Sequence, residues 1–231
     1  MAMGTGDRRH HAALLATALC NLIHGLLAPL PTFTTPAAVP FNNGLYFFYQ
    51  QGETSPHAPE GRIVRVGNHP RSQDGLKRRL GMHYSGNKNS SVFRKFLGGA
   101  LLRSRDPTHA CLQPTPGKGH WEKHGAPTCA RCGPVERELS GLLNEQFWFR
   151  CVEMEDKDTR NRFEELLVAT LSLCAVCKAS SGWLGHHAYS DMVKESGLWN
   201  ASYVFDDTRL MSEADLKLLA DLAHSLGGRA A

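Results

Sequence analysis

The stretch "PFNNGLYFFYQ" (residues 40–50) passes from turn-forming residues into four consecutive aromatic residues. Aromatic side chains are enriched in strands, while Pro, Asn and Gly mark the turn that precedes one. A polar loop, "GETSPHAPEG" (52–61), separates this stretch from "GRIVRVG" (61–67), which is rich in β-branched residues. The pattern predicts an antiparallel hairpin made of residues 44–51 and 61–67.

Helical patterns and one further strand accompany the hairpin. Near the N-terminus, apolar residues recur at helical spacing up to Pro29 and predict an amphipathic helix: Leu15, Leu19, Leu22, Ile23 and Leu26. Further helices are predicted from Asp74 to Tyr84, over residues 92–102, and from Pro134 onward. Two more are predicted, one that begins after a cap at Asp158 and one that runs from a cap at Ser212 to Gly227. A strand is predicted over residues 147–154. We therefore expect an α/β fold in which residues 1–40 form an N-terminal helix and connector. Residues 41–231 form the domain, with a long loop at 103–133.

Composition is that of a globular protein with a mild basic excess. The chain has 231 residues, a hydrophobic share of 42% and a net charge of +4, which permits binding to a polyanion without requiring it. Asn21 and His24 interrupt the N-terminal apolar run, and no small-residue cleavage site follows it. We therefore expect a cytoplasmic protein without a membrane span, and the odd number of seven cysteines argues against a disulfide scaffold.

Several polar residues around the hairpin are candidates for a site. Tyr46 and Phe48 share one face of the predicted strand, and Arg65 is a charge between two valines. Arg79 and His83 are four positions apart, so a helix places them one turn apart on one face. The structural alternatives are a core aromatic for Tyr46, an edge strand with Arg65 in solvent, and a solvated helix face for "LKRRL".

The order of these residues resembles the GIY-YIG nuclease family. "GLY" opens one strand, Gly67 closes the next as part of "RVG", and "RLGMH" follows on a helix; bacterial members with a VYFF-type first strand and an RVG second strand are similar. The segment "WLGHHAYSDMVKESGLWN" (183–200) also resembles the end of those proteins, so the resemblance covers about residues 41–204. It implies a small mixed or antiparallel three-stranded sheet flanked by helices.

The resemblance implies a metal-dependent endonuclease that hydrolyses DNA phosphodiester bonds. Tyr46 would bind or activate the attacking water with His83 as proton acceptor, and Arg79 together with Arg65 would stabilise charge on the phosphate. Glu164, with Glu165 as the alternative, would hold Mg²⁺ or Mn²⁺. Implied substrate-binding residues are Gly44, which would keep the approach open, Gly67, His69, Lys77, Arg78 and Asn200.

Two features depart from the family pattern and keep other functions open. Arg65 stands where the second tyrosine is normally found, and the family's asparagine has only Asn200 as a stand-in. A non-catalytic nucleic-acid-binding protein on the same fold is one alternative. A small α/β domain that binds protein partners is the other. Beside Lys77 and Arg78, further basic residues would add a phosphate-binding surface: Lys88, Arg94 and Lys95.

The cysteines form two CxxC motifs. Cys129 and Cys132 belong to "CARC", and Cys174 and Cys177 belong to "CAVC". Paired CxxC motifs are typical of a four-thiolate Zn²⁺ site, which would place all four sulfurs within about 4 Å of one another. The alternative is that they are free cysteines in the core.

Overall fold

The computed structural model describes residues 5–69, 75–114, 120–123 and 130–227. Its sheet consists of β1 (Gly44–Gln50), β2 (Ile63–Gly67) and β3 (Phe147–Glu153) in the order β2-β1-β3. Both pairings of β1 are antiparallel. The predicted hairpin and the predicted third strand are therefore confirmed, as is the α/β fold with a three-stranded sheet.

The register places the candidate residues on one face of the sheet. Tyr46 lies opposite Gly67 on β2 and Cys151 on β3, and Phe48 lies opposite Arg65 and Phe149. Because directly opposed residues point to the same side, Tyr46 and Arg65 share a face on adjacent strands. This arrangement was expected for a shared site.

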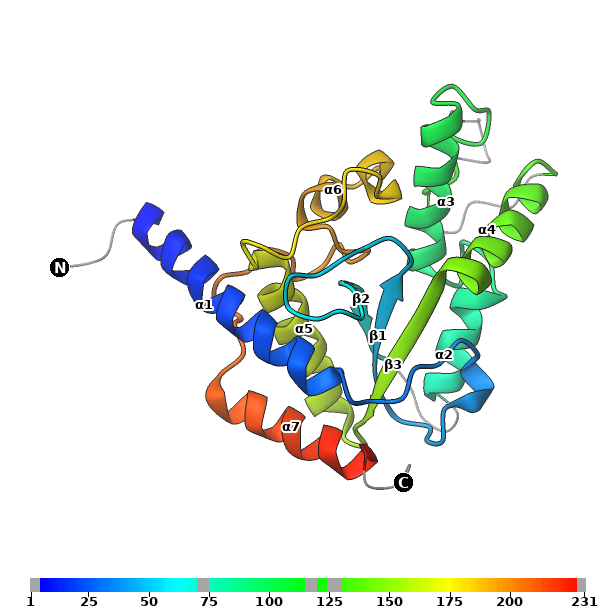
Figure 1. The fold of residues 1–231 in the computed structure, drawn as a ribbon. Coiled ribbons are helices and arrows are strands. Elements are labelled where there is room, and N and C mark those ends of the chain that lie inside the picture. The colour runs from blue at the N-terminus through cyan, green and yellow to red at the C-terminus, as the bar shows by residue number, and fades with distance from the viewer. Residues whose placement is uncertain (1–4, 70–74, 115–119, 124–129, 228–231) are drawn as a thin grey trace.

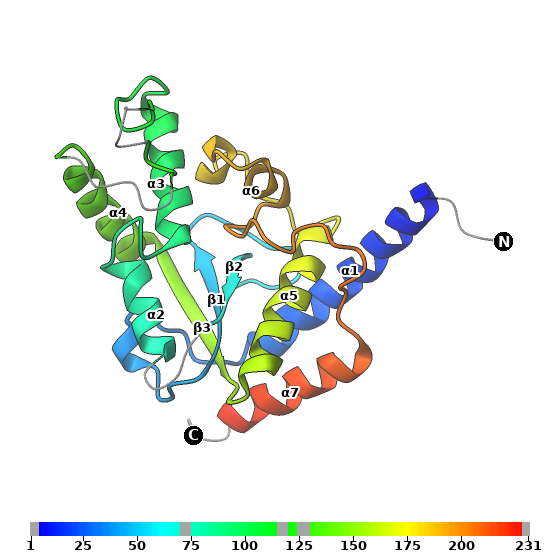
Figure 2. The same cartoon turned by 180° about the vertical axis from the view of Figure 1, so that it is seen from behind.

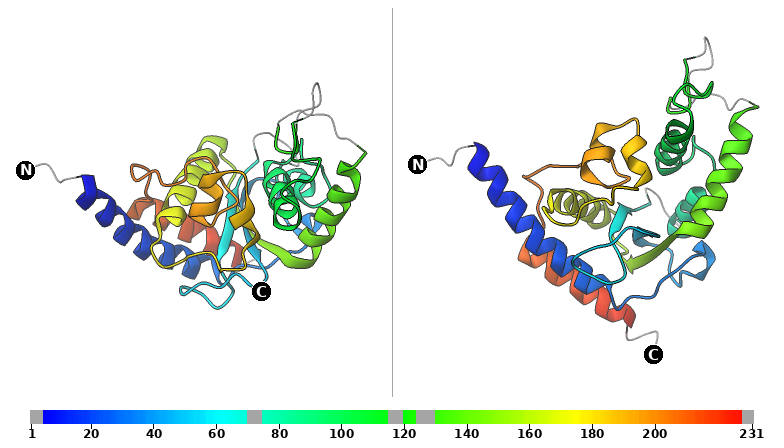
Figure 3. Two further views of the ribbon diagram at one scale, coloured as in Figure 1. Left: turned by 90° about the horizontal axis from the view of Figure 1, so that it is seen from above. Right: turned by 45° about the horizontal axis from the view of Figure 1, so that its top comes forward.

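Helices cover both faces of the sheet. The Tyr46 face packs against α2 (Gly75–Tyr84) and α3 (Val92–Arg105), with α4 (Cys132–Gln146) beside them (Figures 1 and 2). The opposite face is covered by α1 (Thr5–Leu27), α5 (Lys157–Leu173) and α7 (Glu213–Gly227). α1 and α7 run side by side, as Figure 3 shows.

The helix α1 contributes to the same core as the sheet. It buries Ala16, Cys20, Ile23 and Leu27, whereas Leu22 of the predicted apolar stripe is 51% exposed. By length and composition alone the stretch Arg9–Leu27 could cross a membrane, but 39% of it is buried against the rest of the protein. A buried face is what a helix shows when it packs on a hydrophobic core.

The segment that follows α6 (Asp191–Ser196) covers the outer edge of β2. The Trp199 N–H donates to the Val64 carbonyl at 2.7 Å. The Asn200 side-chain amide accepts from the Val66 N–H at 3.1 Å and donates to the Val66 carbonyl at 2.8 Å. The backbone groups of this strand therefore find partners on both sides, which an uncovered edge would lack. Two short 3₁₀ helices complete the described elements, Pro36–Ala38 and Leu184–His187.

Two local predictions need comment. Asp156, not Asp158, caps α5, because its carboxylate accepts from the Thr159 N–H at 2.8 Å. Ser212 caps α7 as predicted, accepting from the Asp215 N–H at 3.2 Å while the Asp215 carboxylate accepts from the Ser212 N–H at 3.0 Å. This reciprocal pair is a capping box.

The predicted loop 103–133 is shorter at both ends, since α3 continues to Arg105 and α4 begins at Cys132. Part of the loop is anchored in the core. Trp121 is 1% exposed, and its indole N–H donates to the Lys95 carbonyl at 3.0 Å.

Candidate active site

A chain of three polar side chains lies at the centre of the Tyr46 face. The Tyr46 hydroxyl is 2.8 Å from His83 Nε2, and His83 Nδ1 is 2.7 Å from Ser91 Oγ. Ser91 is also the N-cap of α3, where its oxygen accepts from the Arg94 N–H. Tyr46 and His83 are fully buried. The His83 side chain on α2 is therefore held between Tyr46 of β1 and Ser91 at the start of α3.

Burial keeps this histidine neutral. Desolvation lowers the pKa of His83 well below its usual value, and the positive charges of Arg65, Arg79 and Arg94 lower the pKa further. A neutral imidazole has one protonated nitrogen and one that accepts. With the proton on Nδ1, shared with Ser91, Nε2 is free to accept the hydrogen bond of Tyr46.

Gly67 is required by the position of the Tyr46 ring. A Cβ at Gly67 would lie 2.2 Å from the Tyr46 hydroxyl oxygen, far inside van der Waals contact. The glycine at the end of β2 therefore makes room for the phenol, and any side chain there would displace it. Gly44 has a different reason: its Cβ would lie 2.3 Å from the Val152 carbonyl oxygen on β3. It allows two strands to approach, and this packing, rather than an open approach to the site, explains the glycine.

Arg65 reaches from β2 into the same region. Arg65 is only 6% exposed, so the alternative in which its side chain lies in solvent is wrong. One guanidinium nitrogen donates to the Trp199 carbonyl, and the guanidinium lies 5.3 Å from the centroid of the Phe93 ring. Its Nε has no hydrogen-bond partner within the part of the chain that the structure describes.

Arg79 lies one turn before His83 on α2. It is partly exposed, and its Nη1 donates to the Ser90 carbonyl at 3.1 Å. Like Arg65, it has a buried Nε without a partner among the described residues. Two arginines thus converge near the Tyr46–His83 pair with hydrogen-bonding capacity still unused.

Glu164 approaches from α5. Burial raises the pKa of its carboxyl, while the charges of Arg65 and Arg79 and a hydrogen bond from the Asn68 N–H oppose that rise. Glu165, the alternative, instead forms an ion pair with Arg209. The geometry therefore favours Glu164 as the carboxylate of this site.

A comparison with known protein families agrees with this arrangement. The family model described as "GIY-YIG domain" matches residues 14–226, which is most of the chain. The chain belongs to the GIY-YIG family. No curated protein and no solved structure matches it significantly. The resemblance inferred from the strand and helix motifs is thereby confirmed, and the match includes most of α1.

GIY-YIG domains are generally found in nucleases, which implies a nucleic-acid substrate for this member. The two stretches on which the resemblance was based, Gly44–Tyr46 and Arg65–Gly67, lie on neighbouring antiparallel strands.

Other predicted residues of the GIY-YIG site have structural roles. Both polar atoms of the Asn200 amide are bound to the Val66 backbone, so Asn200 holds the edge of β2. His69 is 1% exposed; its Nε2 accepts from the Gly44 N–H at 3.4 Å, and its ring lies where a side chain at Gly75 would be.

The predicted basic surface is only partly on the surface. Lys77 is partly exposed and Arg78 is exposed, but Lys88, Arg94 and Lys95 are buried. Arg94 forms an ion pair with Glu136 at 2.8 Å and donates to the carbonyls of His83 and Tyr84, which end α2. It thus fixes the end of the helix that carries His83.

Sequence reasoning missed Ser91 and Asn68. Ser91 directly precedes an apolar helix, and this N-cap signal could have drawn attention to it. Nothing in the sequence distinguishes Asn68, whose backbone N–H binds Glu164.

Among the described residues, Cys132 and the CAVC motif have different sulfur neighbours, which differs from the predicted four-thiolate site. Cys132 Sγ lies 3.9 Å from Cys111 Sγ, and Cys129 lies outside the described residues. Cys174 and Cys177 instead lie against Cys20 of α1. The error has a simple cause, because sequence spacing does not reveal which distant helix faces a motif.

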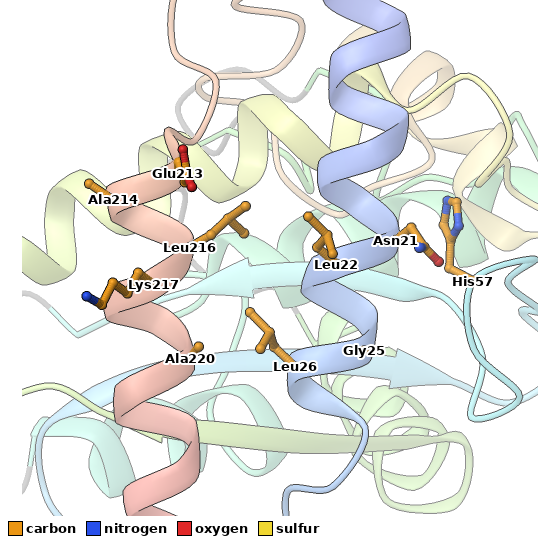
Figure 4. A pocket seen from close by; sticks show the side chains of 10 residues that line it. All are labelled: Asn21, Leu22, Gly25, Leu26, His57, Glu213, Ala214, Leu216, Lys217 and Ala220. Atoms are coloured by element: carbon orange, nitrogen blue, oxygen red, sulfur yellow. The ribbon is translucent and has the colours of Figure 1, made fainter.

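An apolar pocket lies elsewhere, between α1 and α7. Figure 4 shows Leu22 and Leu26 of α1 directed toward Leu216 of α7, with His57 at the far side of α1. None of the candidate active-site residues lines it.

Proposed function

We propose that this protein is a metal-dependent endonuclease that hydrolyses phosphodiester bonds in DNA. The observation that carries the proposal is the buried Tyr46–His83 hydrogen bond of 2.8 Å, beside two arginines and the carboxylate of Glu164. These are the groups that proton transfer, charge stabilisation and metal binding require.

In this proposal Tyr46 binds the attacking water. The water oxygen attacks phosphorus and the bond from phosphorus to the leaving oxygen breaks. The water proton passes to the Tyr46 oxygen while the Tyr46 proton passes to His83 Nε2. In the free protein the three arginine charges disfavour an imidazolium ion. A bound phosphodiester is an anion that offsets those charges, so the pKa of His83 rises when substrate is in place and the transfer becomes more favourable.

Arg79 and Arg65 receive the phosphate. Each has a buried Nε that lacks a partner among the residues described, and a guanidinium binds phosphate oxygens through its planar set of donors. Arg65, in place of a tyrosine, contributes positive charge instead of a hydroxyl group. Tyr46 and His83 therefore carry the proton transfer without a second phenol.

Glu164 would hold the divalent ion, Mg²⁺ or Mn²⁺. A single carboxylate at the edge of an arginine-lined phosphate site suits Mg²⁺, which keeps several waters and binds through one or two carboxylates plus phosphate oxygens. When bound, such an ion supplies Lewis-acid stabilisation of the leaving oxygen.

A nucleic-acid-binding protein without activity is the second candidate. Two observations favour it: Tyr46 and His83 are fully buried, and Arg65 replaces the second tyrosine. Binding alone would use the arginines and leave the Tyr46–His83 pair as a core hydrogen bond.

Substitution of Glu164 separates these functions. Glu164→Gln keeps the size of the side chain and removes the charge, so we expect it to abolish cleavage of plasmid DNA in Mg²⁺ while DNA affinity is unchanged or slightly higher. Arg79→Ala should weaken both, because Arg79 meets the phosphate before and during reaction. The matched control is Glu165→Gln, which removes the same charge one position away and should cleave at the wild-type rate. Cleavage by Glu164→Gln at the wild-type rate would disprove the metal assignment. A wild type inactive with every divalent ion would support the binding-only function.

A further inference from the structure

A cluster of cysteine and histidine side chains lies on the opposite side of the sheet from the Tyr46 face. Cys20 and His24 lie on α1, Cys174 and Cys177 lie at the end of α5, and His57 lies in the loop between β1 and β2. These three segments are far apart in sequence. The packing of α1 on α5, together with the position of the β1–β2 loop, brings them together.

The ligand atoms of the cluster fall into two groups with the spacing of a metal site. Cys20 belongs to both groups, whereas Cys174 and Cys177 belong to different ones, so a single ion would have to draw these two sulfurs together. The ligand atoms of Cys20, His57 and Cys174 lie within 4.8 Å of one another, and so do those of Cys20, His24 and Cys177. His57 Nε2 is 3.3 Å from Cys174 Sγ, and His24 Nε2 is 3.9 Å from Cys177 Sγ. Zn–S bonds of about 2.3 Å place tetrahedral sulfur ligands about 3.8 Å apart, and sulfur–nitrogen pairs slightly closer.

We propose that this cluster binds a structural Zn²⁺ ion through the thiolates of Cys20, Cys174 and Cys177 and one imidazole, that of His24 or His57. The two histidines flank the sulfurs, with ring centroids 5.7 Å apart. Four ligands of this kind complete the closed tetrahedral shell of a structural zinc site.

Details of the backbone and burial agree with a metal site. The Cys177 N–H donates to Cys174 Sγ at 3.4 Å, an interaction that stabilises a thiolate within a CxxC turn. His24 is only 1% exposed, and its Nε2 faces the Cys177 sulfur, so this potential ligand atom is buried together with the thiols.

Zinc binds cysteine as the thiolate, so the ion would displace the thiol protons of Cys20, Cys174 and Cys177 when it binds.

The proposed site joins α1 to the end of α5 and to the β1–β2 loop. His57 is partly exposed, so this imidazole is accessible to solvent while the three cysteines are buried. The site is independent of the proposed nuclease function, since it shares no residue with the Tyr46 face.

The test is the zinc content of purified protein, measured by elemental analysis after growth with zinc. We expect Cys20→Ser and Cys177→Ser each to hold one zinc ion per chain fewer than wild type. Cys151→Ala is the matched control, because Cys151 is a buried free cysteine of β3 outside the cluster, and it should hold as much zinc as wild type. Of His24→Ala and His57→Ala, the variant that loses the zinc ion identifies the fourth ligand.

Measurements on the wild type keep the test valid if a variant fails to fold. Co²⁺ added to the metal-free wild type should give the visible bands of a tetrahedral ion with thiolate charge transfer, and Glu164→Gln should give the same spectrum. Equal zinc in wild type and Cys177→Ser would overturn the proposal, as would retention of zinc by both histidine variants. A thiol assay on the denatured wild type provides a further check. A count two below the seven cysteines of the sequence would indicate a disulfide and would also overturn the proposal.

Discussion

Removal of one oxygen atom from Tyr46 tests whether the buried tyrosine performs chemistry. Tyr46→Phe keeps the ring that packs against Gly67 and Phe48 but removes the hydroxyl group 2.8 Å from His83 Nε2. His83 is fully buried, so its nitrogen cannot exchange the lost partner for water. An unsatisfied buried group of this kind costs about 1–3 kcal/mol. For a chain of this length that lowers the melting temperature by about 2–4 °C per kcal/mol.

The effect on cleavage should be much larger than the effect on stability. If the Tyr46 hydroxyl passes the proton of the attacking water to His83, its loss should slow cleavage by about 10²–10⁴-fold. DNA affinity should stay unchanged, because the arginines bind the phosphate. Initial rates of plasmid nicking, DNA binding at fixed salt and thermal unfolding measure the three quantities.

Tyr84→Phe is the matched control for Tyr46→Phe. Tyr84 follows His83 on α2, is 4% exposed and donates its hydroxyl hydrogen to the Phe147 carbonyl at 3.2 Å. Its substitution should reduce stability by a similar amount and leave the cleavage rate unchanged. If Tyr46→Phe cleaves DNA as fast as wild type, the hydroxyl has no catalytic role. Equal losses of activity in both variants would attribute the effect to packing.

Three further predictions concern packing, charge and pH. Gly67→Ala should destabilise the protein by about 1–3 kcal/mol in a urea titration and reduce cleavage, because the new Cβ would lie 2.2 Å from the Tyr46 hydroxyl oxygen. The control is Gly141→Ala on α4, whose Cβ would meet no atom within 4 Å and which should be neutral or stabilising in the same titration. Glu53→Gln should lower the free energy of unfolding by about 3–5 kcal/mol, because it leaves the buried Arg62 without its charged partner at 2.6 Å. Glu138→Gln removes the same charge from an exposed pair with Arg105 and should cost less than about 1 kcal/mol. Equal losses in the two variants would refute the argument from burial. The pKa of His83 is lowered in the folded state, so below about pH 6.5 the unfolded chain binds a proton that the folded chain does not. The free energy of unfolding should therefore decrease as the pH is lowered, by up to about 1.4 kcal/mol per pH unit. His83→Gln should remove this slope in urea titrations from pH 7 to 5.5, and an unchanged slope would show that other groups cause it.

The sequence by itself determined the strands and the family. Four aromatic residues after a turn, and a β-branched run ending in glycine, specify a hairpin because the side-chain alternation of a strand is local. The spacing of Arg79 and His83 similarly predicts one helix face without reference to the rest of the chain. These local patterns were sufficient to identify the GIY-YIG resemblance and to single out Tyr46, Arg79 and His83, whereas Glu164 followed from the resemblance itself.

The tertiary structure alone decided what the polar residues contact. Asn200 resembles a site residue in sequence, but its amide is bound to the Val66 backbone, 134 positions away. The sequence predicted a site that joins Cys174 and Cys177 to the other CxxC motif, Cys129 and Cys132. The structure instead places Cys174 and Cys177 against Cys20 and two histidines. Hydrogen bonds and metal ligands act over a few ångströms, and the contacts that satisfy them come from segments more than a hundred residues apart. The packing of α1 on α5 and of the C-terminal segment on β2 brings these segments together, and no local periodicity encodes it.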